Sequence, residues 1–423
     1  AAGGNTISSG TFTVAGGGTA TTDRVFDIGM DGIFGGGFGG SVRVNVTMSN
    51  LTIQNGNVTE EASLGGNFAR GGAIRYDGFG QAGTRATFSC TSCVISNNQA
   101  DHDTGGVFDQ YASISYSLVT FNTNIGKAGP GGGLQFLAST PATLTISSST
   151  FISNEARTGN VFGSPATDVD GGAIAANFDN NTGTINTTNF LNNISHDDGG
   201  AIKAFNGAVT VTGGSINNNS SRDDGGGVWG DNDTVNVARF LTLNNIFIQG
   251  NTANSDNSGG GDGGGIFRDR GTTNVTNCTV GGTGGQLNVG VNGGGIAHAF
   301  RAAATPSNVA AINIDNSFVN GNTATTSGGG VFFNDTNFGT AGTLVVGSTT
   351  TVTIDENNAN LHGGGLFVSG GATDTLTRAT FTGNDADADN NASGDGGGLY
   401  HNNAGGTTTI ASTVSFTSNG NGT

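Results

Sequence analysis

Residues 171–202 contain one complete copy of the pattern that decides the fold. The stretch begins Gly171-Gly-Ala-Ile174, continues to Phe190-Leu-Asn-Asn193 and returns to Gly199-Gly-Ala-Ile202. Its two motifs are a glycine pair followed by an aliphatic residue, and Phe-x-x-Asn. Copies of the two motifs alternate from Leu51 to Asn419. An internal repeat of this kind determines the architecture of the whole chain.

The spacing of the copies predicts stacked strands. Successive glycine motifs lie 27 to 39 residues apart, and the length varies in segments rich in Gly, Asn, Asp and Ser, which are typical of loops. Runs such as Ala208-Val-Thr-Val-Thr212 alternate apolar with polar residues, the period of a half-buried strand. Short repeated strands bury their apolar faces by stacking coil on coil. We therefore expect an all-β, right-handed parallel β-helix of about 12 coils, with N-terminal strands or a cap in residues 1–50 and repeats in residues 51–423.

Composition limits the partners and the location. The 423 residues include 79 Gly but only 4 Pro, and the net charge is −17. Lysine occurs only at Lys127 and Lys203, so no basic face is available for nucleic acid. No run reaches the roughly 18 apolar residues of a transmembrane segment. The chain starts at Ala1-Ala2, as it would after removal of a signal peptide, and we expect a secreted, extracellular protein of the cell surface.

Phenylalanine and asparagine are expected to form the interior. We predict that the glycines turn sharp corners with positive φ or without room for a Cβ. The Asn of each Phe-x-x-Asn motif should occupy another corner in left-handed backbone and bond its amide to the Asn above and below. One buried stack of rings is predicted for Phe151, Phe190, Phe247, Phe318 and Phe381.

Cysteine usage is sparse. The three cysteines, Cys90, Cys93 and Cys278, are too few for a disulfide framework. No further residues that could bind zinc accompany them at the usual spacing. We expect each to be a small buried side chain, and a local bridge between Cys90 and Cys93 is the less favoured alternative.

A second aromatic column follows the glycine motif by one residue. Strict strand alternation would expose this column as a contact face for sugars or for lateral association. A bend that turns both columns inward is the alternative, and we favour the bend. The column consists of Phe108, Trp229, Phe267, Phe332, Phe367 and Tyr400.

Aspartates recur just before the glycine corner. Stacked at one coil spacing, their charges would repel, which a hard cation such as Ca²⁺ would relieve. Asp as a turn former that bonds its own backbone explains the pattern at least as well. No cofactor is required by the pattern. The candidate calcium ligands are Asp170, Asp198, Asp224, Asp262 and Asp395.

The rival function is that of a β-helix polysaccharide-binding protein, lyase or hydrolase, which needs grouped carboxylates or cations on one face. We assign one column to the position two residues past each glycine-motif anchor, and this column carries no acidic cluster. The best local group is Arg268-Asp269-Arg270, with Lys203 and Asp231 on preceding coils and His298 on the next, and scattered solvated charges explain it better than a site does. The assigned column is Arg75, Asp109, Phe136, Ala175, Lys203, Gly230, Arg268, His298, Phe333, Val368 and His401.

The alternating GGA-I and FxxN motifs resemble the passenger repeats of the chlamydial polymorphic outer membrane proteins and of related bacterial surface β-helix proteins. Matching copies include Gly71-Gly-Ala-Ile74 and Phe121 to Asn124. The resemblance implies an exported, autotransporter-like passenger that works as an adhesin. Fold resemblance supports architecture more than function.

Both ends of the chain read as strands. Residues Thr6 to Val14 and Thr407 to Phe416 carry no helix, proline or charge cover, and uncovered strand edges invite pairing with another chain. We therefore expect a structural or adhesive surface protein, not an enzyme, that binds further copies of itself end to end, by head-to-tail stacking or by N-terminal strand donation. Carbohydrate or a host or cell surface is the expected further partner.

Overall fold

The computed structural model describes residues 5–7, 10–13, 25–28, 45–59, 70–77, 86–138, 142–161, 164–165, 169–179, 181–231, 239–299, 310–336, 342–391, 393–402 and 405–420. The chain divides into two compact units. Unit 1 is Ala1–Asp197 with Ala201–Gly207, and unit 2 is Asp198–Gly200 with Ala208–Thr423. No α-helix occurs among these residues, and none of their helical turns could cross a membrane.

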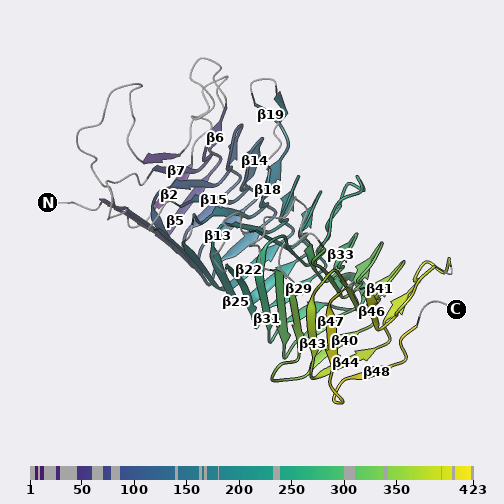
Figure 1. Ribbon diagram of the computed structural model, residues 1–423. Helices are drawn as coiled ribbons and strands as arrows, with labels where there is room; N and C mark the ends of the chain where they lie inside the picture. Colours follow the sequence, from purple (N-terminus) through teal and green to yellow (C-terminus); the bar gives the residue numbers. More distant parts are fainter. Residues whose placement is uncertain are drawn as a thin grey trace. The chain divides into compact units, whose positions relative to one another are not determined.

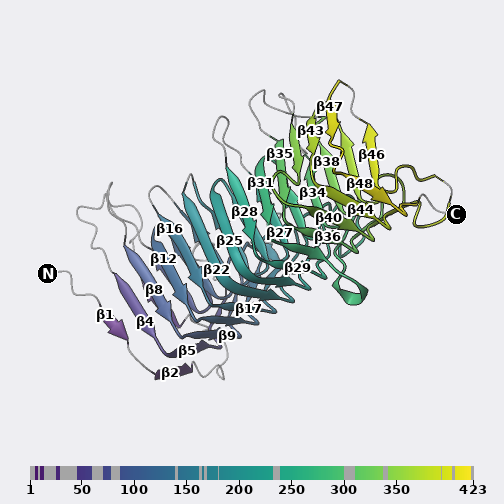
Figure 2. The same ribbon diagram turned by 90° about the horizontal axis from the view of Figure 1, so that it is seen from below.

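Unit 1 consists of parallel strands stacked in register. The longest sheet has two neighbouring strands in each coil, and a short strand follows them before the glycine corner (Figures 1 and 2). The first row is β1 (Asn5–Ile7), β4 (Val46–Ser49), β8 (Thr87–Thr91), β12 (Ser113–Ser117), β16 (Thr143–Ser147) and the start of β22 (Thr182–Leu191). The second row is β2 (Gly10–Thr13), β5 (Leu51–Gln54), β9 (Val94–Ser96), β13 (Thr120–Asn122), β17 (Thr150–Ile152) and the end of β22. The short strands are β6 (Asn57–Val58), β10 (Gln99–Ala100), β14 (Ile125–Lys127), β18 (Glu155–Arg157) and β23 (Ile194–Ser195).

The strand after each glycine corner builds a separate sheet. In unit 1 this sheet is β3 (Phe26–Ile28), β7 (Ile74–Asp77), β11 (Val107–Gln110), β15 (Leu134–Leu137), β21 (Ile174–Asn177) and β24 (Ile202–Phe205). An insertion in the fifth coil, between β18 and β21, carries the antiparallel pair β19 (Asn160–Val161) and β20 (Ser164–Pro165).

Unit 2 repeats the same arrangement, with a 3₁₀ turn at Gly284–Gln286. Its first row is β25 (Ala208–Asn217), β28 (Phe240–Asn244), β31 (Gly271–Thr276), β35 (Ala310–Asp315), β39 (Thr343–Val346), β43 (Thr373–Leu376) and β47 (Thr407–Ile410). Its second row is the end of β25, then β29 (Phe247–Gln249), β32 (Thr279–Gly281), β36 (Phe318–Asn320), β40 (Val352–Asp355), β44 (Ala379–Thr382) and β48 (Ser415–Thr417). Its short strands are β26 (Ser220–Ser221), β33 (Val289–Gly290), β37 (Thr323–Ala324), β41 (Asn358–Ala359) and β45 (Asp385–Ala386). Its glycine-corner strands are β27 (Val228–Asp231), β30 (Ile266–Arg268), β34 (Ile296–Ala299), β38 (Val331–Asn334), β42 (Leu366–Ser369) and β46 (Leu399–Asn402).

These sheets confirm the predicted all-β parallel β-helix. The described glycine-corner strands number six in unit 1 and six in unit 2, in agreement with the expected dozen coils. The right hand of the coils stays a prediction, which rests on the general handedness of parallel crossover connections. Residues 1–50 contribute β1 to β4, which pair in parallel with the strands of later coils.

Glycine is required at the corners by geometry. Gly263 has a φ of 67°, a left-handed conformation that side chains with a Cβ rarely adopt. A Cβ on the next residue, Gly264, would lie 2.4 Å from the backbone of Val289 on the following coil. The corner therefore excludes larger residues because the next coil's backbone lies against it.

Asparagine forms the predicted ladder at another corner. The Asn251 amide nitrogen donates to Oδ1 of Asn288 at 3.0 Å, and Oδ1 of Asn251 accepts from the Asn219 amide at 3.0 Å. The left-handed residue is the one before the ladder Asn, for example Asn218 with a φ of 54°, so the expected left-handed backbone at the ladder Asn itself is wrong. The ladder comprises Asn98, Asn124, Asn154 and Asn193 in unit 1, and Asn219, Asn251, Asn288, Asn322, Asn357, Asn384 and Asn419 in unit 2.

The predicted phenylalanine stack is confirmed only in part. Phe151, Phe190 and Phe381 are fully buried, and the Phe151 and Phe190 rings stack 5.1 Å apart. Phe247 and Phe318 are each 54% exposed, so the predicted register is wrong in these two coils. The inward residue there is the next one, Ile248 or Val319, because it stands three positions before the ladder Asn as Phe151 does.

The prediction for the cysteines is also confirmed only in part. Cys90 and Cys93 form a disulfide, so the expectation of a plain buried side chain is wrong for this pair and the alternative is correct. Cys278 is buried and not bridged, as predicted. Burial raises the pKa of the Cys278 thiol to about 11, which keeps it protonated and unreactive at neutral pH.

Candidate functional site

The column assigned to the strand after the glycine corner combines two different faces. Arg75 pairs in register with Phe108, and Tyr76 pairs with Asp109. Likewise Ala175 stands between Gln135 and Lys203. The aliphatic residue after Ala in the GGA-I copies is the true anchor, so the assignment of Arg75, Ala175 and Lys203 to the Asp109 column is wrong by one residue. The inward column is Tyr76, Asp109, Phe136, Ala176 and Ala204 in unit 1, and Gly230, Arg268, His298, Phe333, Val368 and His401 in unit 2.

The sequence led us to expect solvated charges around Arg268. This expectation is wrong. Arg268 is only 1% exposed, and its guanidinium donates to the carbonyl of Arg239 at 3.1 Å. His298, in register with Arg268 on the next coil, is fully buried with Nε2 3.0 Å from the carbonyl of Gly271. Arg270 pairs with Asp231 through two contacts, of which Nε to Oδ1 is 2.7 Å. The charges are thus held inside the coil and at its margin.

Burial controls the protonation of this group. Desolvation, helped by the charge of Arg268, lowers the pKa of His298 to about 3. Desolvation also lowers the pKa of Arg268 to about 10, still above neutral pH. At pH 7 His298 is therefore neutral and Arg268 is charged. A general acid or base works best with a pKa near the operating pH, and a polysaccharide outside the coil could not contact either side chain.

The aromatic column does not form an exposed contact face. Phe108 and Phe267 are each 1% exposed, and Trp229 and Phe332 are each 7% exposed. The Arg70 guanidinium, which lies just before β7 on the preceding coil, is 5.0 Å from the centre of the Phe108 ring. The hypothesis of an exposed aromatic face is therefore wrong for these four rings. Toward the last coils Phe332, Phe367 and Tyr400 stack on one another, and only Phe367 and Tyr400 are partly exposed.

The aspartate column of unit 2 is in register and bonded to backbone. Oδ1 of Asp198 accepts from the amide of Asp224 at 3.1 Å, and Oδ1 of Asp224 accepts from the amide of Asp262 at 2.7 Å. Oδ1 of Asp262 accepts from the amide of Asn292 at 3.0 Å. Each carboxylate thus bonds a backbone amide at the corner of the next coil, and not its own backbone as the turn-forming explanation expected.

Asp170 and Asp395, two further predicted calcium ligands, have different surroundings. In unit 1 Asp170 is buried and forms an ion pair with Lys203. Asp395 has a side chain 70% exposed, with His362 3.8 Å away. Within unit 2 the carboxylates of Asp198, Asp223 and Asp224 place ligand oxygens within 4.8 Å of one another. This group retains the chemistry of a hard-cation site, and it includes Asp223, which was not among the candidate ligands predicted from the sequence.

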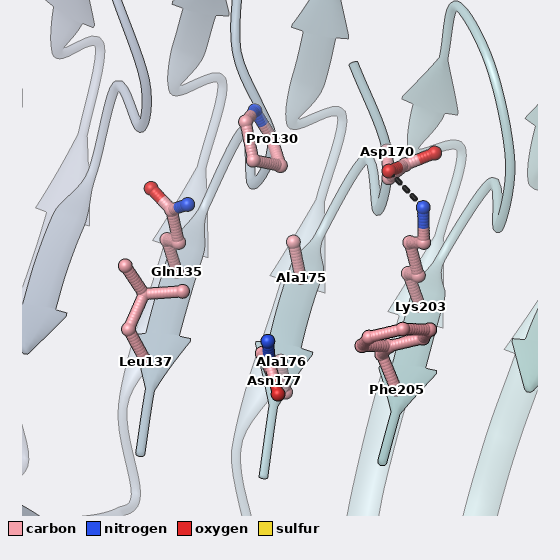
Figure 3. A pocket seen from close by; sticks show the side chains of 9 residues that line it. All are labelled: Pro130, Gln135, Leu137, Asp170, Ala175, Ala176, Asn177, Lys203 and Phe205. Carbon is pink, nitrogen blue, oxygen red and sulfur yellow. Dashed lines mark hydrogen bonds and ion pairs between the residues drawn. The ribbon is translucent and has the colours of Figure 1, made fainter. Parts of the chain in front are cut away.

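A pocket of about 230 Å³ lies on the outer face of β15, β21 and β24 in unit 1 (Figure 3). Ala175 forms its floor, with Gln135 on one neighbouring strand and Lys203 on the other. No motif of the sequence predicted this pocket. One feature of the sequence could have indicated it. Ala175 places a small methyl group in a column where other coils carry the large rings of Phe108 or Trp229.

Comparisons with protein-family models, with curated proteins and with solved structures found no match for this chain. The resemblance to bacterial surface β-helix repeats therefore stays a prediction from the motifs.

Proposed function

We propose that this chain is a secreted structural element of a cell surface that associates end to end with further copies of itself. The observation that carries the proposal is the last described coil. Among the described residues its strands β46, β47 and β48 pair on one side only, with β42, β43 and β44. An open row of strand donors and acceptors is a template for another strand.

The same coil also presents apolar side chains and an open amide ladder. Ile410 is 47% exposed and Phe416 is 44% exposed, although their equivalents in earlier coils are buried. Asn419 accepts from Asn384 and donates to the carbonyl of Phe381. In the preceding coils of unit 2, each ladder amide donates onward to the next Asn, as Asn384 does at 2.9 Å. A further coil would cover the apolar groups and continue the ladder.

The other end offers matching geometry. Strands β1 and β2 pair in parallel with β4 and β5 of the same chain, and their second edges have no strand partner among the described residues. Stacking of this edge on the last coil of another copy would keep every strand parallel. Because unlike ends meet, the contact is heterologous and extends into a filament. Since β1 and β2 already pair within their own chain, we favour coil stacking over strand donation.

Sedimentation velocity of the purified 423-residue chain tests this proposal. The wild-type protein should show oligomers that grow with concentration, and Phe416→Asp should remain monomeric because a carboxylate would be buried in the contact. Phe318→Asp is the matched control, since Phe318 is also exposed, at 54%, but lies on the side of the coil. A wild-type protein that stays monomeric, or a Phe416→Asp variant that assembles like the wild type, would contradict the proposal.

A further inference from the structure

The pocket of unit 1 is built from two rows of three side chains on consecutive coils. One row is Gln135, Ala175 and Lys203, and the other is Leu137, Asn177 and Phe205. The strands are roughly 4.8 Å apart, so the outer members of a row stand on the order of 10 Å apart. The single methyl group of Ala175 leaves the space between them open (Figure 3).

Two amide groups at the pocket have donors to offer. Oε1 of Gln135 accepts from the hydroxyl of Thr104 at 3.1 Å, and Oδ1 of Asn177 accepts from the amide of Asp179 at 3.2 Å. Both carbonyl oxygens are therefore occupied, which assigns the amide orientation. Within the described residues neither Nε2 of Gln135 nor Nδ2 of Asn177 donates a hydrogen bond. Gln135 is only 4% exposed, so its position is fixed by packing.

The two charged residues that line the pocket, Lys203 and Asp170, carry opposite charges. Lys203 reaches up from the wall to the buried carboxylate of Asp170, as Figure 3 shows. The pair offers both donor and acceptor atoms without net charge. Asp170 and the net charge of −17 disfavour an anionic ligand. A ligand that suits this pocket is uncharged and carries several groups that accept and donate hydrogen bonds.

We propose that this pocket binds one neutral sugar unit of a glycan. The hydroxyl groups of a sugar would accept from the amides of Gln135 and Asn177 and would bond the Lys203 and Asp170 pair. Its apolar C–H face would pack on Phe205 and Leu137, since aromatic rings provide large apolar contact area. A volume of about 230 Å³ is below the roughly 300–1,000 Å³ of sites for drug-sized ligands, which suits a single ring of a longer chain. The site does not depend on end-to-end stacking.

Ligand-observed NMR with the full-length chain tests the assignment. The probes are neutral hexasaccharides of glucose, mannose, galactose and N-acetylglucosamine, with hexagalacturonic acid as the anionic probe. At least one neutral probe should bind. Asn177→Ala should weaken that binding about three- to tenfold, the effect of one hydrogen bond. Ala175→Trp should abolish it by filling the pocket, and Trp229 shows that the column accepts this residue in another coil.

Asn334→Ala is the matched control. Asn334 occupies the same position of its coil and bonds the amide of Thr336 at 3.0 Å, as Asn177 bonds that of Asp179, but it lies outside the pocket. This control should bind the neutral probe like the wild type. Circular dichroism and unfolding temperature would verify that the variants fold. The proposal is overturned if no neutral probe binds, if only hexagalacturonic acid binds, or if Asn177→Ala binds no more weakly than Asn334→Ala.

Discussion

Each ladder asparagine uses its amide to hold two neighbouring coils together. The Asn251 amide donates to Asn288 and to the carbonyl of Ile216, and its oxygen accepts from both the backbone and the side chain of Asn219. All of these groups are buried. A buried donor or acceptor left without a partner costs about 1–3 kcal/mol, so the ladder residues should be among the least replaceable in the chain.

Asn251→Ala should therefore lower the free energy of unfolding by about 3 kcal/mol or more, because it leaves several buried groups unpaired. Asn313→Ala is the control, since the Asn313 amide also bonds the coil below, at 2.9 Å from Asn274, but on the solvent-facing side. The control should cost less than about 1 kcal/mol. Urea unfolding of the two variants measures the difference, and equal costs would show that the buried ladder has no special role.

His298 should make unit 2 sensitive to acid. Its pKa is about 3 in the folded chain, against an ordinary value of 6.5. Between these two pH values the unfolded chain binds a proton that the folded chain does not, so the free energy of unfolding falls as the pH falls. The largest slope from one such group is about 1.4 kcal/mol per pH unit.

The test is His298→Gln, which removes the titrating ring and keeps a side chain able to donate to Gly271. Urea unfolding between pH 4 and pH 7 should show that the variant loses less stability toward acid than the wild type. The difference corresponds to the uptake of up to one proton on unfolding. Identical pH dependence in the two proteins would mean that the pKa of His298 does not change on folding.

At the scale of the strand, position relative to the ladder decides what is buried. Phe381 stands three residues before Asn384 and is fully buried, while Phe318 stands four residues before Asn322 and is 54% exposed. Phe381→Ala should cost roughly 3 to 5 kcal/mol, as is usual for a buried aromatic residue. Phe318→Ala should change the free energy of unfolding by less than about 0.5 kcal/mol. Similar losses in chemical denaturation of both variants would refute this register.

The corners could be predicted from the sequence because nearly every copy carries the same glycine pair and the same Asn. The two misplaced rings, Phe247 and Phe318, come from copies in which two apolar residues are adjacent and the bulkier one is outside. Only the spacing to the ladder Asn distinguishes them. The pocket was harder to predict, because Gln135, Ala175 and Lys203 are 40 and 28 residues apart. Their register depends on the lengths of the insertions between them.

The calcium hypothesis now concerns Asp198, Asp223 and Asp224. Carboxylate oxygens of these three residues lie within 4.8 Å of one another. A cation that takes six to eight oxygen ligands would relieve the repulsion between their charges. If Ca²⁺ binds, it should raise the unfolding temperature, EGTA should reverse the effect, and Asp223→Asn should abolish it. Asp395→Asn is the control and should leave the effect intact. An unfolding temperature that neither Ca²⁺ nor EGTA changes would remove calcium from the account.

At the scale of the whole molecule, the charge of −17 opposes self-association. Salt screens repulsion between copies, with a Debye length of about 10 Å at 0.1 M. Assembly should therefore increase between low salt and roughly 0.5 M NaCl, whereas contacts made mainly by ion pairs would weaken. Light scattering across this range measures the direction, and assembly that disappears with salt would contradict a contact made of apolar groups and backbone hydrogen bonds.

Electron microscopy of the purified chain at increasing concentration and raised salt tests the central claim most directly. Coil stacking between copies predicts unbranched filaments one molecule wide, with a layer line near 4.8 Å along the axis because strand spacing continues across each junction. Dispersed single particles at every concentration, or filaments without that repeat along the axis, would contradict end-to-end assembly of the β-helix.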